Sequence, residues 1–356
     1  MTSTTQIHSS IGIEEKSVYH DHLAKVFDPI LAEFDAVMKR YAAFNLFFTF
    51  VCALEFILLV VFFAFLAQSL ILALSLSVVF FTFFAYFTLR VYFKAKKPEQ
   101  LKAIKEQYLT ACKNLIGYRE HLGEHHVALA NACSKFANRL HGREYNYYRL
   151  PFGMGSGFAP LMEQLSCWIH WEDVHLMKEM MLEAAVEEHV ELVKCQATNL
   201  EAHAGLANSY VMLSGLYIDP RKMEGYDDDR WIPADKYDDR FETKFRAIAE
   251  RAIEEFKILS EYAPDDSWVH SQLAYSYHDM QMPLEEIKEY ETIQRLMPED
   301  RDNLYKLGIL YFQQGMNAKG LRVYEELRKG HYKKAESLIK YYGTFKPNLP
   351  LNSSTI

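Results

Sequence analysis

Residues 44–93 of this chain read FNLFFTFVCALEFILLVVFFAFLAQSLILALSLSVVFFTFFAYFTLRVYF. These 50 residues include no Gly and no Pro, and their only formal charges are Glu55 and Arg90. A single helix of that length would measure about 75 Å, more than twice the hydrocarbon core of a bilayer. We therefore expect the stretch to fold back on itself, and its weakest point is Ala67-Gln68-Ser69.

The two halves of this stretch, 44–66 and 70–93, are each long enough to cross a bilayer with modest tilt. A buried hairpin in a soluble bundle is the alternative, but large apolar side chains on every face argue against it. Basic residues flank the hairpin on both outer sides, and none lies at its turn: Lys39, Arg40, Arg90, Lys94, Lys96 and Lys97. The positive-inside rule then places both termini in the cytoplasm. We expect an integral membrane protein, of a bacterial inner membrane, that contacts the lipid bilayer through residues 44–93.

Glu55 lies near the middle of the first apolar half. A charge at that depth costs about 2.5–3.5 kcal/mol on insertion scales, so we expect its carboxyl group to be protonated or paired. Ser77 and Thr82 lie at about the matching depth in the second half. Glu55 is therefore a candidate intramembrane polar site, for helix association or proton handling; a tolerated neutral acid is the alternative.

The composition of the chain limits its function. With 356 residues, a net charge of −8 and an isoelectric point near 6.0, it lacks the basic balance of a general nucleic-acid-binding protein. Residues 1–10 are polar and lack the basic and apolar regions of a cleavable signal peptide. Five scattered cysteines without a CxxC pair indicate reduced thiols in a cytoplasmic domain.

The segments on either side of the hairpin have helical periodicity. Residues 1–43 form a cytoplasmic N-terminal region with an amphipathic helix, whose apolar stripe runs from Val26 to Met38. Residues 94–157 form a helical linker region, in which Lys97-Pro98 is expected to open a new helix. The glycines at 153–157 lack the Lys-Ser/Thr of a phosphate-binding loop, so they favour a flexible linker.

One cluster in the linker region has the residue types of a metal site: His121, Glu124, His125 and His126. It lies at a helix junction broken by Gly123, and it has neither an HExxH motif nor a cysteine pair. A solvated turn is the favoured interpretation.

A period of 34 residues runs through the C-terminal part of the chain. It relates Pro264 to Pro298, Leu273 to Leu307, Tyr277 to Tyr311 and Tyr290 to Tyr324. A fixed period of this length, in a sequence without strand patterns, indicates stacked helix pairs. The predicted fold class is therefore all-α, with a two-helix transmembrane hairpin followed by an α-helical solenoid.

The residues within this period resemble the tetratricopeptide repeat (TPR) family. The Leu-Gly-x-x-Tyr core of that family corresponds to Leu307-Gly308-x-x-Tyr311, with Gly315 at the inter-helix turn and Gly320 and Tyr324 on the second helix. Earlier units carry Leu273-Ala274-x-x-Tyr277 and Leu206-Ala207-x-x-Tyr210. The resemblance implies a TPR superhelix over residues 158–345.

The predicted superhelix divides into a degenerate repeat at 166–197, a repeat at 200–264, repeats at 267–298 and 301–330, and a capping helix at 331–342. The repeat at 200–264 carries an insertion at 218–240 that is rich in Asp, Pro and Tyr. We expect this insertion to be a solvated loop, available to a partner, and residues 346–356 to be a disordered tail.

TPR domains bind peptides in a concave groove lined by the first helix of each repeat, so the resemblance implies a protein or peptide partner. Mapped by repeat position, the groove comprises Asn208, Val211, Trp268, Gln272, Tyr275, His278, Tyr305, Lys306, Ile309 and Phe312. The clamp of chaperone-binding members needs several basic and amide residues, of which only Asn208 and Lys306 match. Ordinary packing between repeats is the alternative role for Trp268, Tyr275 and Phe312.

The sequence has no nucleophile elbow, phosphate-binding loop, zinc motif or activated carboxylate pair, so we expect no enzyme, cofactor, metal or small-molecule substrate. The leading hypothesis is a membrane-anchored TPR scaffold or adaptor on the cytoplasmic face. One alternative is an accessory subunit of a membrane assembly or secretion complex, with partners at the hairpin. Another is a bilobed-hairpin protein of a vacuole membrane. An enzyme using the histidines at 121–126 is kept for contrast.

Overall fold

The computed structural model describes residues 3–62, 70–148, 159–222 and 231–345; within these ranges, side chains are described from residue 26 onward, apart from those of residues 70, 71, 222 and 234. Within these ranges every regular element is a helix, so the all-α prediction is confirmed for them. Four features of the sequence lie outside the described residues: the expected turn at 67–69, the glycine-rich loop at 151–158, Asp227–Asp229 of the insertion, and the tail at 346–356.

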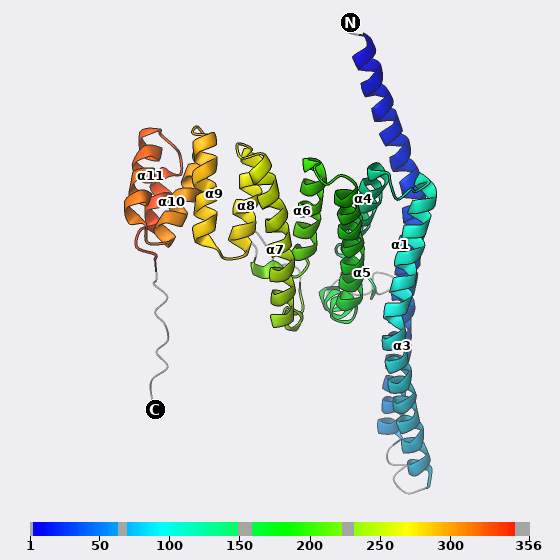
Figure 1. Cartoon of the computed structure of the whole chain (residues 1–356). Coiled ribbons are helices and arrows are strands. Elements are labelled where there is room, and N and C mark those ends of the chain that lie inside the picture. Colours follow the sequence, from blue (N-terminus) through cyan, green and yellow to red (C-terminus); the bar gives the residue numbers. More distant parts are fainter. Residues whose placement is uncertain (1–2, 63–69, 149–158, 223–230, 346–356) are drawn as a thin grey trace, which may run out of the picture. The chain divides into compact units, whose positions relative to one another are not determined.

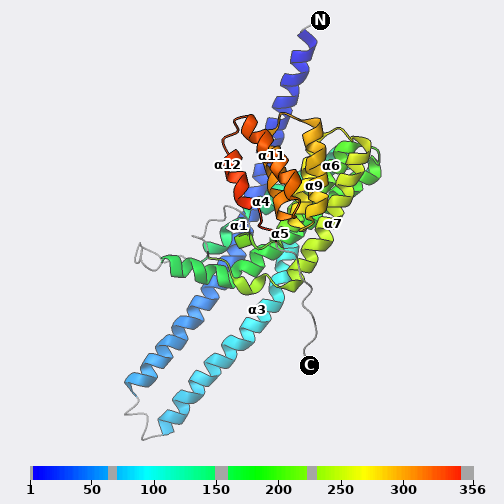
Figure 2. The ribbon, with the colours of Figure 1, turned by 90° about the vertical axis from the view of Figure 1, so that its left-hand side faces the viewer.

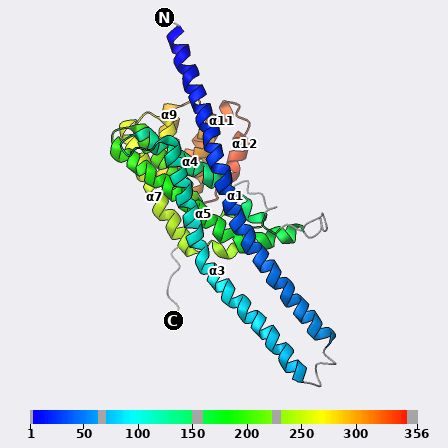
Figure 3. The ribbon, with the colours of Figure 1, turned by 90° about the vertical axis from the view of Figure 1, so that its right-hand side faces the viewer.

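Two long helices, α1 (Ser3–Val61) and α3 (Leu70–Ile116), lie side by side through the apolar stretch (Figures 1, 2 and 3). Both are long and apolar enough to cross a membrane, and their most apolar windows are not buried. Large side chains from Leu46 to Tyr92 are exposed along both helices, among them Phe80 at 74% and Phe81 at 71%. Monomeric soluble proteins rarely expose a continuous apolar surface of this size.

Pro98 does not begin a helix, contrary to the sequence expectation, because α3 runs through it without a break. Contacts on both sides of the proline hold this part of the helix. Before it, Phe93 packs against the ring of Tyr41 at 5.5 Å, and Lys97 pairs with Asp173 at 2.6 Å. After it, Gln100 accepts a hydrogen bond from Tyr41 at 2.7 Å. These contacts compensate for the backbone hydrogen bond that proline cannot donate.

The chain separates into two compact units, which are described individually. Unit 1 comprises residues 1–195 and 219–238, and unit 2 comprises residues 196–218 and 239–356. The boundary therefore differs from the one expected at 157/158. The reason is that α4 (Gly123–Arg139), placed by the sequence in a linker region, packs along α5 (Ala159–Cys195). The two share a core with α1 and α3 that includes Phe34, Tyr108, Leu129, Phe136 and Met177.

Unit 2 consists of three successive helix pairs (Figure 1). Helix α6 (Leu200–Gly215) packs on α7 (Asp239–Tyr262), α8 (Ser267–Asp279) on α9 (Pro283–Leu296), and α10 (Arg301–Gln313) on α11 (Asn317–Lys329). The first helix of each pair is capped by a side-chain oxygen, from Asn199, Asp266 and Asp300. Such caps satisfy amides that have no partner inside the helix. At the predicted capping helix, α12 (Ala335–Leu338) and η5 (Ile339–Tyr341) pack on α10.

The described part of the insertion is not a solvated loop. It contains η3 (Pro220–Lys222) and η4 (Ala234–Lys236), and it belongs to unit 1. The Trp231 carbonyl accepts a hydrogen bond at 3.0 Å from Tyr145, in η1 (Arg143–Tyr145). Lys236 pairs with Glu172 of α5 at 2.6 Å, and the rings of Trp171 and Tyr237 pack edge to face. These contacts correct the expectation, because apolar and paired groups hold the segment.

Candidate functional site

The predicted groove residues separate into three classes by exposure. Asn208, Val211, Trp268, Tyr275, His278 and Lys306 are exposed. Gln272, Tyr305 and Ile309 are half-buried, and Tyr305 bonds to Ser337 at 2.7 Å. Phe312 is fully buried. The exposed members lie on α6, α8 and α10, the first helices of the three pairs of unit 2.

Phe312 corrects the sequence expectation, because its side chain lies in the core and cannot meet a partner. A Cβ atom built on Gly320 would come within 2.6 Å of the Phe312 ring. The glycine therefore admits the ring between α10 and α11. Tyr342 packs on the same ring at 5.8 Å.

Tyr275 and Lys306 form the best-defined part of the exposed surface. Tyr275 is 48% exposed, and the Lys306 ammonium lies 5.4 Å from the centroid of its ring. Trp268, about two turns before Tyr275 on α8, is 43% exposed and meets the buried ring of Phe256 edge to face. Trp268 is thus anchored on a buried ring at one edge, and both aromatic side chains are partly open to solvent, as in protein-binding surfaces. We call Trp268, Tyr275 and Lys306 the aromatic surface.

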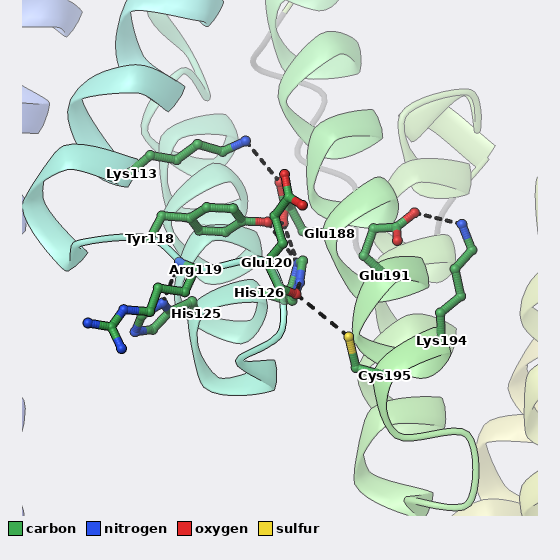
Figure 4. A network of polar contacts seen from close by, with 10 residues as sticks. All are labelled: Lys113, Tyr118, Arg119, Glu120, His125, His126, Glu188, Glu191, Lys194 and Cys195. Carbon is green, nitrogen blue, oxygen red and sulfur yellow. Dashed lines mark hydrogen bonds and ion pairs between the residues drawn. The ribbon is translucent and has the colours of Figure 1, made fainter.

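His125 and His126, two members of the histidine cluster at 121–126, have different hydrogen-bond partners (Figure 4). His125 accepts a hydrogen bond from the Arg119 amide at 2.9 Å. His126 is buried and points to Glu188 of α5, whose Oε2 lies 2.7 Å from Nδ1. In the part of the chain that the structure describes, no group of three or more His, Cys, Asp or Glu side chains could hold a metal ion.

Tyr118 and Lys113 complete the surroundings of Glu188 (Figure 4). The Tyr118 hydroxyl donates to Glu188 Oε2 at 3.2 Å, and the Lys113 ammonium lies 3.8 Å from Oε1. Burial, together with the Glu188 carboxylate, raises the pKa of Tyr118 well above its usual value. Tyr118 therefore stays a neutral donor, and the network is a structural one that joins α3, α4 and α5.

The contact between His126 and Glu188 recurs twice among the residues that the structure describes. His203 Nδ1 lies 2.6 Å from Glu255 Oε2, and His270 Nδ1 lies 2.6 Å from Glu289 Oε2. In each case Nε2 faces the backbone carbonyl six residues earlier, at 2.8, 3.0 and 2.9 Å for His126, His203 and His270. Each imidazole ring thus lies between a carboxylate oxygen on one side and a backbone carbonyl oxygen on the other, and both of these oxygens are hydrogen-bond acceptors.

We call each of these groups a His–Glu clasp. The histidine is always the fourth residue of its helix, in α4, α6 and α8, and the glutamate always lies on the next helix, α5, α7 or α9. The clasp joins the loop before the first helix to the second helix of the pair. It thereby links the two helices of the pairs α4/α5, α6/α7 and α8/α9.

The sequence carries a signal for the clasps that the period of 34 does not include. The histidines begin three similar segments, His126-Val-Ala-Leu-Ala, His203-Ala-Gly-Leu-Ala and His270-Ser-Gln-Leu-Ala. The Leu-Ala dipeptides that follow are buried in all three. The first segment lies outside the period of 34, because the chain between α4 and α5 interrupts it. Its local geometry nevertheless matches that of the later pairs.

Glu55 and Thr82 meet between the two apolar helices. The Thr82 hydroxyl donates to Glu55 Oε1 at 2.7 Å, as the matching depth of the two residues predicted. Ser77, the other expected partner, donates to the Ala73 carbonyl of its own helix. Glu55 Oε2 is buried and has no hydrogen-bond partner among the described residues.

The described chain is thus an all-helical protein with two helices long enough and apolar enough to cross a membrane, and with successive helix pairs that share a clasp. No family model matches the chain, and no curated protein matches its sequence.

Proposed function

We propose that this protein is a membrane-anchored adaptor of the TPR type, which holds a protein partner at the cytoplasmic face of a bacterial inner membrane. The observation that carries the proposal is a hairpin of exposed apolar side chains in the same chain as a series of clasped helix pairs. The hairpin provides the anchor, since its exposed surface suits lipid rather than water. The helix pairs provide a rigid support for the aromatic surface.

The aromatic surface suits a peptide or helix that carries an acidic group. Tyr275 and Trp268 offer half-exposed rings, and the positively charged ammonium group of Lys306 lies over the Tyr275 ring. Tyr and Trp are enriched among the residues that dominate binding energies, since they bury much area at a low entropy cost. Exposed Asn208 on α6 adds amide groups that can bond to an extended backbone.

Affinity recovery with the full-length protein tests the adaptor function. The double variant Tyr275→Ala with Lys306→Glu should reduce recovery of the partner at least about tenfold, since a central Tyr is worth about 2 kcal/mol or more. The matched control is Tyr262→Ala with Lys257→Glu, which makes the same changes at exposed positions of α7. Equal recovery by both variants would place binding away from the aromatic surface. Helical circular dichroism should be the same for all three proteins.

Glu55 favours a second candidate, an accessory subunit whose hairpin contacts a multi-subunit membrane complex. Its Oε2 lacks a partner among the described residues, although it is buried between the helices. An acid in an apolar layer is costly unless a neighbour satisfies it, and a helix of another subunit could supply the donor.

A further inference from the structure

Unit 1 contains a cavity of about 660 Å³, which lies between α1 and the turn that follows α4. It is lined by Asp35, Lys39, Arg139, His141, Gly142, Arg143, Asn146 and Tyr147. This volume lies within the range of sites for small ligands, about 300–1,000 Å³. Its lining is mainly polar and basic, so it suits a charged ligand.

The balance of charge in the cavity is positive. Lys39, Arg139 and Arg143 carry full positive charges, and Asp35 is the only acid in the lining. Both carboxylate oxygens of Asp35 are already engaged, Oδ2 with Arg143 and Oδ1 with the Tyr147 hydroxyl at 3.1 Å. Lys39 and Arg139 are exposed and form no ion pair with the described residues. The charges of the Lys, Arg and Asp side chains in the lining thus sum to +2.

The guanidinium of Arg143 is held in place at the cavity. Its Nε donates to the Arg139 carbonyl at 3.0 Å, and Nη1 donates to Asp35. A guanidinium has five N–H donors, so these two bonds leave others for a ligand. Gly142 makes the turn before it, with a φ of 75° that an L residue rarely adopts. Arg139 lies over the Phe27 ring at 6.0 Å, which steadies the second guanidinium.

The cavity lies close to the start of the apolar surface. Exposed apolar side chains begin at Leu46, and Lys39 precedes Asn45 by six residues of α1, or about 9 Å along the helix. The cavity-lining segment at 141–147 is followed by Tyr148, whose hydroxyl accepts a hydrogen bond from Asn45 at 3.0 Å. This segment therefore also lies next to the start of the apolar surface. The polar headgroup layer of a bilayer is about 5–8 Å thick on each side. Lys39 therefore lies next to that layer if the hairpin spans the membrane.

We propose that this cavity binds a phosphate monoester, and that the phosphate belongs to the headgroup of an anionic membrane lipid. Two guanidinium groups and one ammonium group suit a phosphate, because arginine binds its oxygens through paired N–H donors and lysine adds a point charge. The lipid source rests on the membrane anchoring proposed above, whereas the phosphate chemistry does not. Binding at this site would tie unit 1 to the lipid composition of its membrane.

The test uses full-length protein in neutral detergent micelles and dioctanoyl phosphatidate as the probe, with native mass spectrometry as the readout. The cavity variant Lys39→Gln with Arg139→Gln should bind the probe at least about tenfold more weakly than the wild type, because it loses two charge-assisted contacts. The matched control, Lys94→Gln with Lys102→Gln, removes two exposed charges of α3 that do not line the cavity. It should bind within about twofold of the wild type, as expected for screened surface charges.

The remaining outcomes separate the two parts of the proposal. Glycerol 3-phosphate binding as tightly as the lipid would overturn the membrane source. Absence of saturable phosphatidate binding, or an equal loss in both double variants, would overturn the site itself. Carbonate extraction of wild-type membranes tests the anchor independently, because binding in micelles does not depend on it.

Discussion

The Thr82 hydroxyl donates a hydrogen bond to Glu55 Oε1 at 2.7 Å, between two helices whose neighbouring side chains are nearly all apolar. This bond satisfies one of the two oxygens of the carboxyl group, and the other has no partner among the described residues. The hairpin thus contains one polar link that is only partly satisfied.

Replacing Glu55 distinguishes an internal link from a contact with another subunit. Glu55→Leu should insert into membranes at least as well as the wild type, since an acid costs about 2.5–3.5 kcal/mol at the centre of a span. If another subunit binds Oε2, Glu55→Leu should lose co-purification in detergent, while Glu55→Gln should keep it. Normal assembly of Glu55→Leu would show that Glu55 is passive.

Thiol labelling tests the topology of the hairpin. Cys195 is exposed at the end of α5, whereas Cys112, Cys133 and Cys167 are buried. An impermeant maleimide should label Cys195 only after the cells are permeabilised, and Ser69→Cys already in intact cells. Cys195→Ser is the control for background labelling. Labelling of Cys195 in intact cells would place the helix pairs outside.

The His–Glu clasps should contribute to stability. His203→Ala removes two hydrogen bonds of a largely buried ring, so we expect the free energy of unfolding to fall by about 2 kcal/mol. Lys194→Ala breaks the pair with Glu191 at 2.6 Å, in which both side chains are more than half exposed, and should cost less than about 0.5 kcal/mol. Chemical denaturation of the full chain in detergent measures both. Equal losses would mean that the clasp does not fix the helix pair.

Two glycines give opposite predictions for the same substitution. Gly320→Ala should destabilise the protein by about 1–3 kcal/mol, because the new Cβ would lie 2.6 Å from the buried Phe312 ring. Gly215→Ala should stabilise it by up to about 1 kcal/mol, since no atom lies within 4 Å of its added Cβ and alanine favours the helix. Thermal unfolding followed at 222 nm, the usual helix signal, compares the two. A stable Gly320→Ala protein would show that Phe312 has room to move.

The pH dependence of stability should differ between two histidines. Burial lowers the pKa of His189. The neutral His189 ring therefore makes its full contribution to the free energy of unfolding above the unfolded pKa of about 6.5. This contribution is lost as the pH falls below that value. Burial also opposes the charge on His203, but the bonds to Glu255 and the Ala197 carbonyl outweigh it and raise the pKa. The contribution of charged His203 to the free energy of unfolding is therefore complete below about pH 6.5 and is lost as the pH rises through the folded pKa.

Variants separate these two effects. From pH 7.5 to 5.5, the wild type should lose stability relative to His189→Leu and gain stability relative to His203→Gln. The difference in melting temperature between wild type and variant, measured at both pH values, gives each sign. A difference that does not change with pH would contradict the titration of that histidine.

Local patterns in the sequence predicted most of the helices of this protein, although not that α3 continues through Pro98. The sequence of residues 44–93 predicted two apolar helices, because this stretch is almost entirely apolar and contains no Gly or Pro. The spacing of Leu273, Tyr277, Leu307 and Tyr311 predicted helix pairs, and all four residues are buried where α8/α9 and α10/α11 meet. Such patterns follow from helix geometry, which acts over a few residues.

Only the tertiary structure decided which side chains are exposed to a partner and which are buried in the core. Tyr275 and Phe312 look alike as aromatic residues of first helices, but one is exposed and the other fully buried, because Gly320 makes room for the Phe312 ring. The pairing of α4 with α5 and the packing of the insertion depend on contacts across interruptions of the period. The basic cavity joins Asp35 to Arg143, 108 residues apart. A sequence pattern carries no information about such distant contacts, since they form only when the helices pack.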